Sequence, residues 1–164
     1  MKYLFSLVVL LFTLSCATQN DKNAHSIAKI EYKSTACFGF CPIFDMNINA
    51  NRTATFEAIR FNFTEKPTKD DFSKPNEGSF TGTIKPENYN ELLSLIQAAK
   101  IETLDSKLGN RNVTDMPSAI LKVTYKNGTV KEINDYGKRG TPELAAVYKY
   151  FESLRFNQDW KKVK

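Results

Sequence analysis

Hydrophobic and polar residues alternate along several short stretches from residue 27 onward, which is the period of a β-strand with one face against a core. Four stretches follow this alternation, and their apolar positions are Ala28, Ile30 and Tyr32; Phe44, Met46, Ile48 and Ala50; Phe80, Gly82 and Ile84; and Ala119, Leu121, Val123 and Tyr125. A further stretch, Thr53 to Phe63, loses the alternation between Ala58 and Ile59. This slip indicates a β-bulge, or a strand that is apolar on both faces.

Two other stretches carry apolar residues at the spacing of an α-helix. Pro86 suits the first turn of the first helix, since its missing N–H has no partner there in any case. Thr141 followed by Pro142 and Glu143 predicts the start of the second helix, with Thr141 as its cap. The apolar faces are Tyr89, Leu92, Leu93, Ile96 and Ala99 in the first helix, and Leu144, Val147, Tyr148, Phe151 and Leu154 in the second.

The dipeptide Asn127-Gly128 predicts a β-hairpin, because both positions tolerate a positive φ. The return strand is expected over Thr129 to Tyr136. With Asn127 and Gly128 at the turn, Val130 falls on the same face as Tyr125 and Ile133 falls on the other face. The register of this strand is left open by the pattern.

These elements follow one another as four strands, a helix, two strands and a helix (ββββαββα). We therefore predict a single α+β domain over residues 27–160, with two layers: a mainly antiparallel sheet and two helices on one of its faces. Residues 64–78 and 102–117 lack periodicity and are expected to be loops. Residues 161–164 form a basic tail, which is expected to be a solvated end.

The first residues have the character of a secretory signal peptide. The apolar run over residues 3–14 is too short to span a membrane as a helix. Leu14-Ser15-Cys16 resembles the bacterial lipobox, although Thr13 stands where leucine is usual. We therefore predict a lipoprotein signal peptide over residues 1–15, lipidation of Cys16 by palmitate-type chains, and a polar tether over residues 16–26. A plain secretory signal with an incidental cysteine is the alternative.

This interpretation places the protein in the bacterial cell envelope, held to a membrane by its lipid. The outer membrane is the favoured membrane, with the domain on its periplasmic or surface side. Because that compartment is oxidising, Cys37 and Cys41 are expected to form a disulfide rather than two free thiols. Gly39 between them allows the tight turn that such a short bridge needs.

The composition argues against two classes of function, nucleic-acid binding and catalysis by a histidine. The 164 residues are 41% hydrophobic and 25% charged, as is usual for a globular protein. A net charge of +5 is too small to indicate a nucleic-acid partner. The only histidine, His25, lies in the predicted tether, so a Ser-His-Asp or Cys-His catalytic unit is not expected.

The Cys37–Cys41 string supports three interpretations: a structural disulfide, which we favour, a redox-active pair and a copper site. A thioredoxin-type pair has two intervening residues rather than three, and the copper chaperones that share a C-x-x-x-C-P string need a histidine that this chain lacks. Met46 and Met116 are the soft side chains that remain for Cu(I), and alternation places Met46 on the core face. We expect no metal and no cofactor.

The carboxylates Asp45, Asp115 and Asp135 are the remaining candidates for acid–base chemistry. An outward position on a strand accounts for Asp45, and local turn bonding accounts for Asp115. No catalytic residue is therefore assigned, and the chain is not expected to be an enzyme.

The combined pattern resembles a bacterial lipoprotein domain of unknown function that has a Cys-Phe-Gly-x-Cys-Pro signature near its start. The matching segments are Cys37 to Pro42, Thr114-Asp115 with Pro117, Asn127-Gly128 with Asp135-Tyr136, and Pro142-Glu143-Leu144. The resemblance implies a place in the envelope and supplies no catalytic residue. The predicted function is a non-catalytic binding or structural module with an envelope protein as partner. The alternative is a thiol-disulfide oxidoreductase or a copper-binding protein that acts through Cys37 and Cys41.

Overall fold

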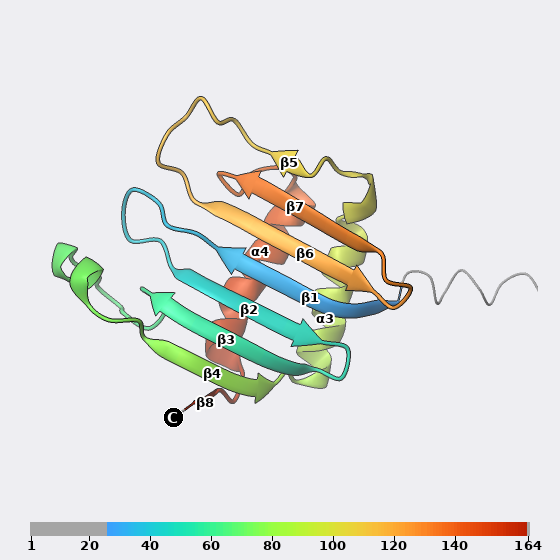
Figure 1. The fold of residues 1–164 in the computed structure, drawn as a ribbon, viewed down its shortest axis with the longest axis horizontal. Helices are drawn as coiled ribbons and strands as arrows, with labels where there is room; N and C mark the ends of the chain where they lie inside the picture. The colour runs from blue at the N-terminus through green and yellow to red at the C-terminus, as the bar shows by residue number, and fades with distance from the viewer. Residues whose placement is uncertain (1–25, 164) are drawn as a thin grey trace, which may run out of the picture.

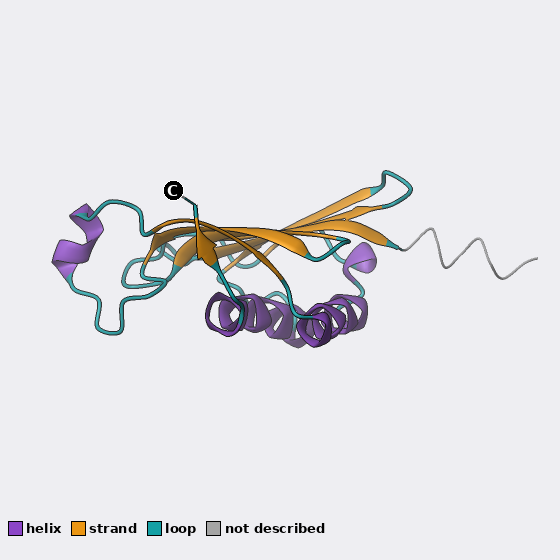
Figure 2. Ribbon diagram, turned by 90° about the horizontal axis from the view of Figure 1, so that it is seen from below, coloured by secondary structure: helices purple, strands orange, loops and turns teal. Residues whose placement is uncertain are grey.

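The computed structural model describes residues 26–163, and it shows an α+β fold of two layers. One layer is a single sheet of eight strands, and the other consists of two α-helices packed on one face of that sheet (Figures 1 and 2). The prediction of a mainly antiparallel sheet with both helices on one face is confirmed. Neither helix among the described residues is long and apolar enough to cross a membrane.

The sheet has the strand order β5-β7-β6-β1-β2-β3-β4-β8, and all neighbours are antiparallel except β5 and β7. The strands are β1 (Ile27–Ser34), β2 (Ile43–Asn49), β3 (Thr53–Arg60), β4 (Gly78–Thr83), β5 (Lys107–Leu108), β6 (Ser118–Tyr125), β7 (Val130–Tyr136) and β8 (Lys161–Lys162). The helices are α3 (Pro86–Ala98) and α4 (Pro142–Asn157), with short 3₁₀ helices η1 (Lys69–Ser73) and η2 (Ile101–Thr103).

The predicted element order ββββαββα is correct for the six long strands and two helices, but it omits β5 and β8. Both are two-residue strands, and β5 lies within the stretch expected to be a loop. Lys161 and Lys162 are exposed, in the tail that was expected to be a solvated end. They also form strand β8, in which Lys161 pairs with Thr81 and Lys162 pairs with Phe80 of β4. A strand this short has no periodicity of its own, because its hydrogen-bonding neighbour decides whether it forms.

The alternating faces of the central strands are confirmed by burial. Ile30 and Tyr32 of β1 face the helices and are buried, as are Phe44, Met46 and Ile48 of β2. The break in the alternation of β3 is a β-bulge, one of the two possibilities that the sequence indicated. Ile43 pairs with Arg60 and Phe44 pairs with Ala58, which leaves Ile59 unpaired. The sheet core closes against α4, where the Tyr32 ring stacks on Phe151 with centroids 4.5 Å apart.

The structure decides the register of β7, which the sequence pattern left open. Ile133 is fully buried opposite Leu121, whereas Val130 pairs with Thr124 and is half exposed. The reason is the turn, since the amide of Tyr125 donates to the carbonyl of Thr129 across a three-residue loop that ends at Gly128 with φ 87°. The third loop residue shifts the pairing by one position, and a shift of one exchanges the two faces of a strand.

Both helix starts are confirmed. Pro86 is in the first turn of α3, and the Thr141 hydroxyl accepts a hydrogen bond from the amide of Leu144 at the start of α4. Such a cap contributes about 1 kcal/mol. The helices pack their predicted apolar faces against the sheet, so the opposite face of the sheet is left to polar side chains.

Candidate functional site

The disulfide predicted between Cys37 and Cys41 is present. It closes the loop between β1 and β2, with Cα atoms 5.8 Å apart, which is within the range of ordinary disulfides. Gly39 at the centre of the loop has φ 144°, a conformation that favours glycine. Both cysteine side chains are half-buried. The loop is therefore a small closed ring at the end of the sheet.

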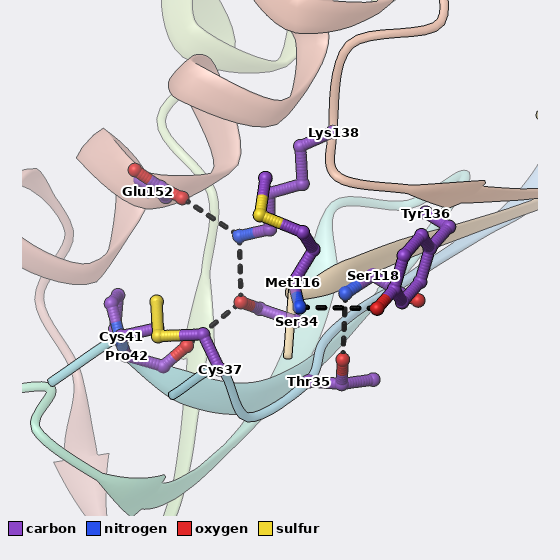
Figure 3. The surroundings of a disulfide bond; sticks show 10 residues. All are labelled: Ser34, Thr35, Cys37, Cys41, Pro42, Met116, Ser118, Tyr136, Lys138 and Glu152. Atoms are coloured by element: carbon purple, nitrogen blue, oxygen red, sulfur yellow. Dashed lines mark hydrogen bonds and ion pairs between the residues drawn. A yellow bond between two sulfur atoms is a disulfide. The ribbon is translucent and has the colours of Figure 1, made fainter. Parts of the chain in front are cut away.

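Hydrogen bonds hold this ring against the segment that leads into β6, and Figure 3 draws those that join Thr35 to Ser118 and Met116 to Tyr136. The amide of Phe38 donates to the carbonyl of Asp115 over 2.9 Å, and the amide of Thr35 donates to the carbonyl of Ser118 over 3.0 Å. The amide of Met116 donates to the hydroxyl oxygen of Tyr136 over 3.2 Å. Segments around residues 37–41, 115–118 and 136 thus meet at one place, although they are far apart in the sequence.

A lysine and a serine meet beside the ring, and the sequence did not indicate this contact. Lys138, between β7 and α4, donates from its ammonium group to the Ser34 hydroxyl oxygen over 2.8 Å and to the Glu152 carboxylate over 3.1 Å. A serine and a lysine at this distance form a nucleophile and base in some hydrolases. Here the Ser34 hydroxyl is 0% exposed and donates its own proton to the carbonyl of Pro42 over 2.7 Å.

The contact between Ser34 and Lys138 connects separate parts of the fold, and it does not activate the serine as a nucleophile. No substrate carbonyl can reach a hydroxyl that is fully covered, and the Lys138 ammonium group donates to both the Ser34 hydroxyl and the Glu152 carboxylate. Ser34, Lys138 and Glu152 instead connect the end of β1, the loop before α4 and α4 itself. We call this group the Ser34–Lys138–Glu152 clamp.

The three candidate carboxylates are not brought together. Asp45 faces away from the helices and forms an ion pair with Lys33 at 3.0 Å, as its outward position predicted. Asp135 is fully buried on the helix side, where it accepts hydrogen bonds from the amides of Arg139 and Gly140. Three strand spacings separate β7 from β2, about 14 Å, and Asp115 contributes its backbone carbonyl to the ring. These positions do not form an acid–base pair.

Two buried tyrosines have strongly raised pKa values. Burial is the main cause for both Tyr32 and Tyr148. The negative charge of Glu152 adds to the effect on the pKa of Tyr32, and that of Asp135 adds to the effect on the pKa of Tyr148. Both hydroxyls therefore stay protonated at neutral pH, in keeping with a place in the core.

Three of the four candidate copper ligands are already engaged in the core or in the disulfide, and Met116 lies in the surroundings of the disulfide (Figure 3). Met46 is fully buried in the core, as alternation predicted, and both cysteine sulfurs are used in the disulfide. Over residues 26–163, no group of three or more His, Cys, Asp and Glu side chains is close enough to hold a metal ion. Cys16 and His25 lie outside the described residues.

The ring carries an exposed aromatic surface that the sequence analysis missed. Phe38 at its apex is 90% exposed, and Phe40 contacts the rings of Phe61 and Phe72 with centroids 5.5 and 5.8 Å away. Phe61 and Phe72 also pack edge to face at 5.1 Å. We call these four residues, Phe38, Phe40, Phe61 and Phe72, the aromatic tip. In the sequence these residues are only two phenylalanines in the ring, one near the end of the stretch from Thr53 to Phe63 and one in a polar loop.

The loop before β4 is held in place under the aromatic tip. The Arg60 guanidinium donates to the carbonyls of Phe72 and Lys74, and the Glu77 carboxylate accepts the amide of Asn62 over 2.9 Å. Within the loop, Asp71 accepts hydrogen bonds from Thr68 and pairs with Lys74. The stretch predicted to be a mobile loop therefore contains η1 and has fixed contacts to β3.

The aromatic tip and the start of the domain lie at opposite ends of the sheet. The β1–β2 loop and η1 are at one end, and β1 begins at the other end, where the chain enters the domain (Figure 1). At about 200 Å² for a whole ring, the exposed parts of the four side chains amount to about 350 Å². About half of this area is on Phe38 at the apex of the ring, and nearly all the rest is on Phe40 and Phe72.

Of two comparisons with known proteins, one identifies a family. A family model described as a domain of unknown function, DUF6438, matches residues 28–155. The match covers the sheet from β1 to β7 and both helices up to Arg155. A search of the curated proteins found no match.

Proposed function

This chain belongs to the DUF6438 family, a domain of unknown function, and from the apolar run that ends at Leu14-Ser15-Cys16 we propose that it is a lipid-anchored protein of the bacterial envelope. Its folded domain acts as a non-catalytic binding module for another envelope protein. The lipid is attached to Cys16, after removal of residues 1–15. The disulfide between Cys37 and Cys41 has a structural role in this proposal.

The observation that carries the binding role is the aromatic tip. Phe38 is 90% exposed on a ring that is closed by a disulfide and pinned to Asp115. An exposed aromatic residue on a rigid loop loses little conformational entropy when a partner covers it, and such residues dominate many interfaces. The loop therefore has the properties of a preorganised contact surface.

The size of the aromatic tip indicates what kind of interface it makes. Its exposed area of about 350 Å² is less than half of the roughly 800 Å² per partner that a standard stable interface buries. The tip alone would therefore support a weak or transient contact. The tip lies at the end of the sheet opposite the start of β1, and in this proposal it points away from the membrane that holds the lipid.

The contacts around the ring support a structural role for the residues that most resemble a catalytic group. The closest arrangement, Ser34 with Lys138, is covered and its hydrogen bonds are all within the protein. The disulfide sulfurs are tied to each other, and their loop is anchored on both sides. These features are those of a scaffold that holds the ring in one position.

The anchor is tested by growing cells with labelled palmitate. Label should appear on the wild-type protein and be missing from Cys16→Ser. Equal labelling of the two proteins would contradict the anchor and leave the plain secretory signal as the explanation.

The binding role is tested with a photo-crosslinking residue placed at Phe38 in living cells. An adduct with one envelope protein is expected at this position and not at Val130, which is half exposed at the other end of the sheet. Equal adducts at both positions, or none at Phe38, would contradict the role of the aromatic tip.

The rival function is tested by replacing both Cys37 and Cys41 with serine. If the disulfide is structural, the double variant has lower stability and the wild type neither reduces a model disulfide nor binds Cu(I). A wild type that does either, with loss of that activity in a folded double variant, would replace our proposal with thiol exchange or copper binding.

A further inference from the structure

A groove of about 760 Å³ lies at the end of the domain opposite the aromatic tip. It runs between α3 and the place where β1 begins, and its apolar walls are formed by Ile27, Tyr89, Leu93 and Ile96. Ile27 and Leu93 are only partly buried, so their side chains face the open space. The volume is in the range of pockets that hold small ligands.

Two lysines stand at the rim of this groove. Lys100 follows the end of α3, and Lys126 follows the end of β6. Both are exposed, and neither ammonium group forms an ion pair with a residue that the structure describes. Glu102 also lines the rim, where its carboxylate accepts the hydrogen bond of the Tyr125 hydroxyl. The charged groups of the rim therefore have an excess of one positive charge.

We propose that this groove binds a free amphiphile with a single alkyl chain and an anionic head group, such as a fatty acid. The alkyl chain would lie along Ile27 and Leu93, whose partly exposed side chains it would remove from water. The carboxylate would meet Lys100 and Lys126, whose long side chains can follow it at the rim. This site is independent of the aromatic tip and of the lipid at Cys16.

The order of affinities follows from these two contacts. Each methylene that enters the groove should tighten binding about two- to fourfold, up to the length at which the chain leaves the groove. A neutral alcohol of the same chain length should bind more weakly than the fatty acid, because it gains nothing from the lysines. An alkylammonium should bind more weakly still.

The test uses the full chain with Cys16→Ser, so that no attached lipid is present. Binding of tetradecanoate, dodecanoate and decanoate is measured by isothermal titration calorimetry below their micelle concentrations. We expect saturable binding of one molecule per chain that weakens in that order. No binding of tetradecanoate, or the same affinity for all three chains, would overturn the proposal.

Two variants locate the site. Leu93→Trp places a larger side chain in the groove and should weaken binding at least tenfold. Gln97→Glu adds a negative charge to the exposed lining without changing the packing, and should weaken tetradecanoate binding about threefold while it strengthens binding of dodecylammonium. Because Gln97 is exposed, this second variant keeps the test valid if Leu93→Trp does not fold.

Matched controls separate the groove from other surfaces. Ser94→Glu adds the same charge to the same helix at an exposed position outside the groove lining, and should leave the affinity unchanged. Phe38→Ala removes the main exposed ring of the aromatic tip and should also have no effect. Loss of tetradecanoate binding in Phe38→Ala, or equal loss in Ser94→Glu and Gln97→Glu, would overturn the assignment.

Discussion

The ammonium group of Lys138 lies 2.8 Å from the hydroxyl oxygen of Ser34, and 104 residues separate them in the chain. This contact ties the loop before α4 to the last residue of β1, just before the disulfide ring begins. The Ser34 hydroxyl in turn donates a hydrogen bond to the carbonyl of Pro42, just after the ring ends. One serine therefore holds both ends of the ring to the rest of the domain.

Ser34→Ala should lower the free energy of unfolding by about 1–3 kcal/mol, because the Pro42 carbonyl and the Lys138 ammonium both lose a buried partner. Chemical denaturation of the two proteins measures the difference. Ser94→Ala on the exposed side of α3 is the matched control and should change stability by less than about 0.5 kcal/mol. Equal effects of the two substitutions would show that the clamp does not stabilise the fold.

Replacement of both Cys37 and Cys41 with serine should lower the free energy of unfolding by about 2 kcal/mol and leave the fold intact. The loop that the disulfide closes is short, so the restriction it places on the unfolded chain is small. The comparison is made by denaturation, and reduction of the wild type should have the same effect. Cys16→Ser, which removes a cysteine outside the disulfide, should not change the stability of the domain.

Asp71 should titrate with a pKa of about 2, below its ordinary value of 3.8, because the Lys74 ammonium and then the Thr68 amide stabilise its charged form. A lowered pKa means that this contact stabilises the loop fully above about pH 4 and is lost as the pH falls through about 2. Carboxyl carbon NMR measures the titration directly.

Lys74→Met should move the pKa of Asp71 back toward 3.8, and Lys69→Met at a neighbouring exposed position should not. A wild-type pKa close to 4 would mean that the Asp71–Lys74 pair does not persist in solution.

Two phenylalanines should respond to alanine in opposite ways. Phe38→Ala should change the free energy of unfolding by less than about 0.5 kcal/mol, because its ring is almost fully exposed. Phe56→Ala should cost about 3–5 kcal/mol, since its fully buried ring packs against Phe44, Phe80 and Trp160. A large loss of stability in Phe38→Ala would mean that the aromatic tip belongs to the core and is not a contact surface.

Two glycines with similar backbone angles should differ in their tolerance of alanine. Gly109 has φ 89°, and a Cβ there would overlap the Tyr136 carbonyl, so Gly109→Ala should displace β5 from β7. Gly128 has φ 87° but open space around it, so Gly128→Ala should cost only the strain of the left-handed conformation, about 1–2 kcal/mol. Thermal unfolding ranks the two variants, and equal losses would contradict the close contact of β5 with β7.

The faces of the central strands could be predicted from the sequence because alternation is a local property. Met46 is buried and Asp45 points outward, as their neighbours in the chain require. The face of Ile133 could not be predicted in the same way. One additional residue in the hairpin loop reverses it, and Asn127-Gly128 is compatible with both loop lengths.

The candidate site also has one part that could be predicted from the sequence and other parts that could not. Cys37 and Cys41 are close in the chain, so their disulfide followed from spacing and compartment. The contact of Lys138 with Ser34, the aromatic tip and the groove beside α3 each depend on residues from separate elements.

The sequence by itself determined what local chemistry controls: the period of the long strands, the first turns of both helices and the short disulfide ring. Only the tertiary structure decided which of these pieces meet, because strand order and register are set by packing and hydrogen bonds between distant segments. For that reason the aromatic tip could not be read from single phenylalanines. It forms only when Phe72 is folded back beside Phe40 and Phe61.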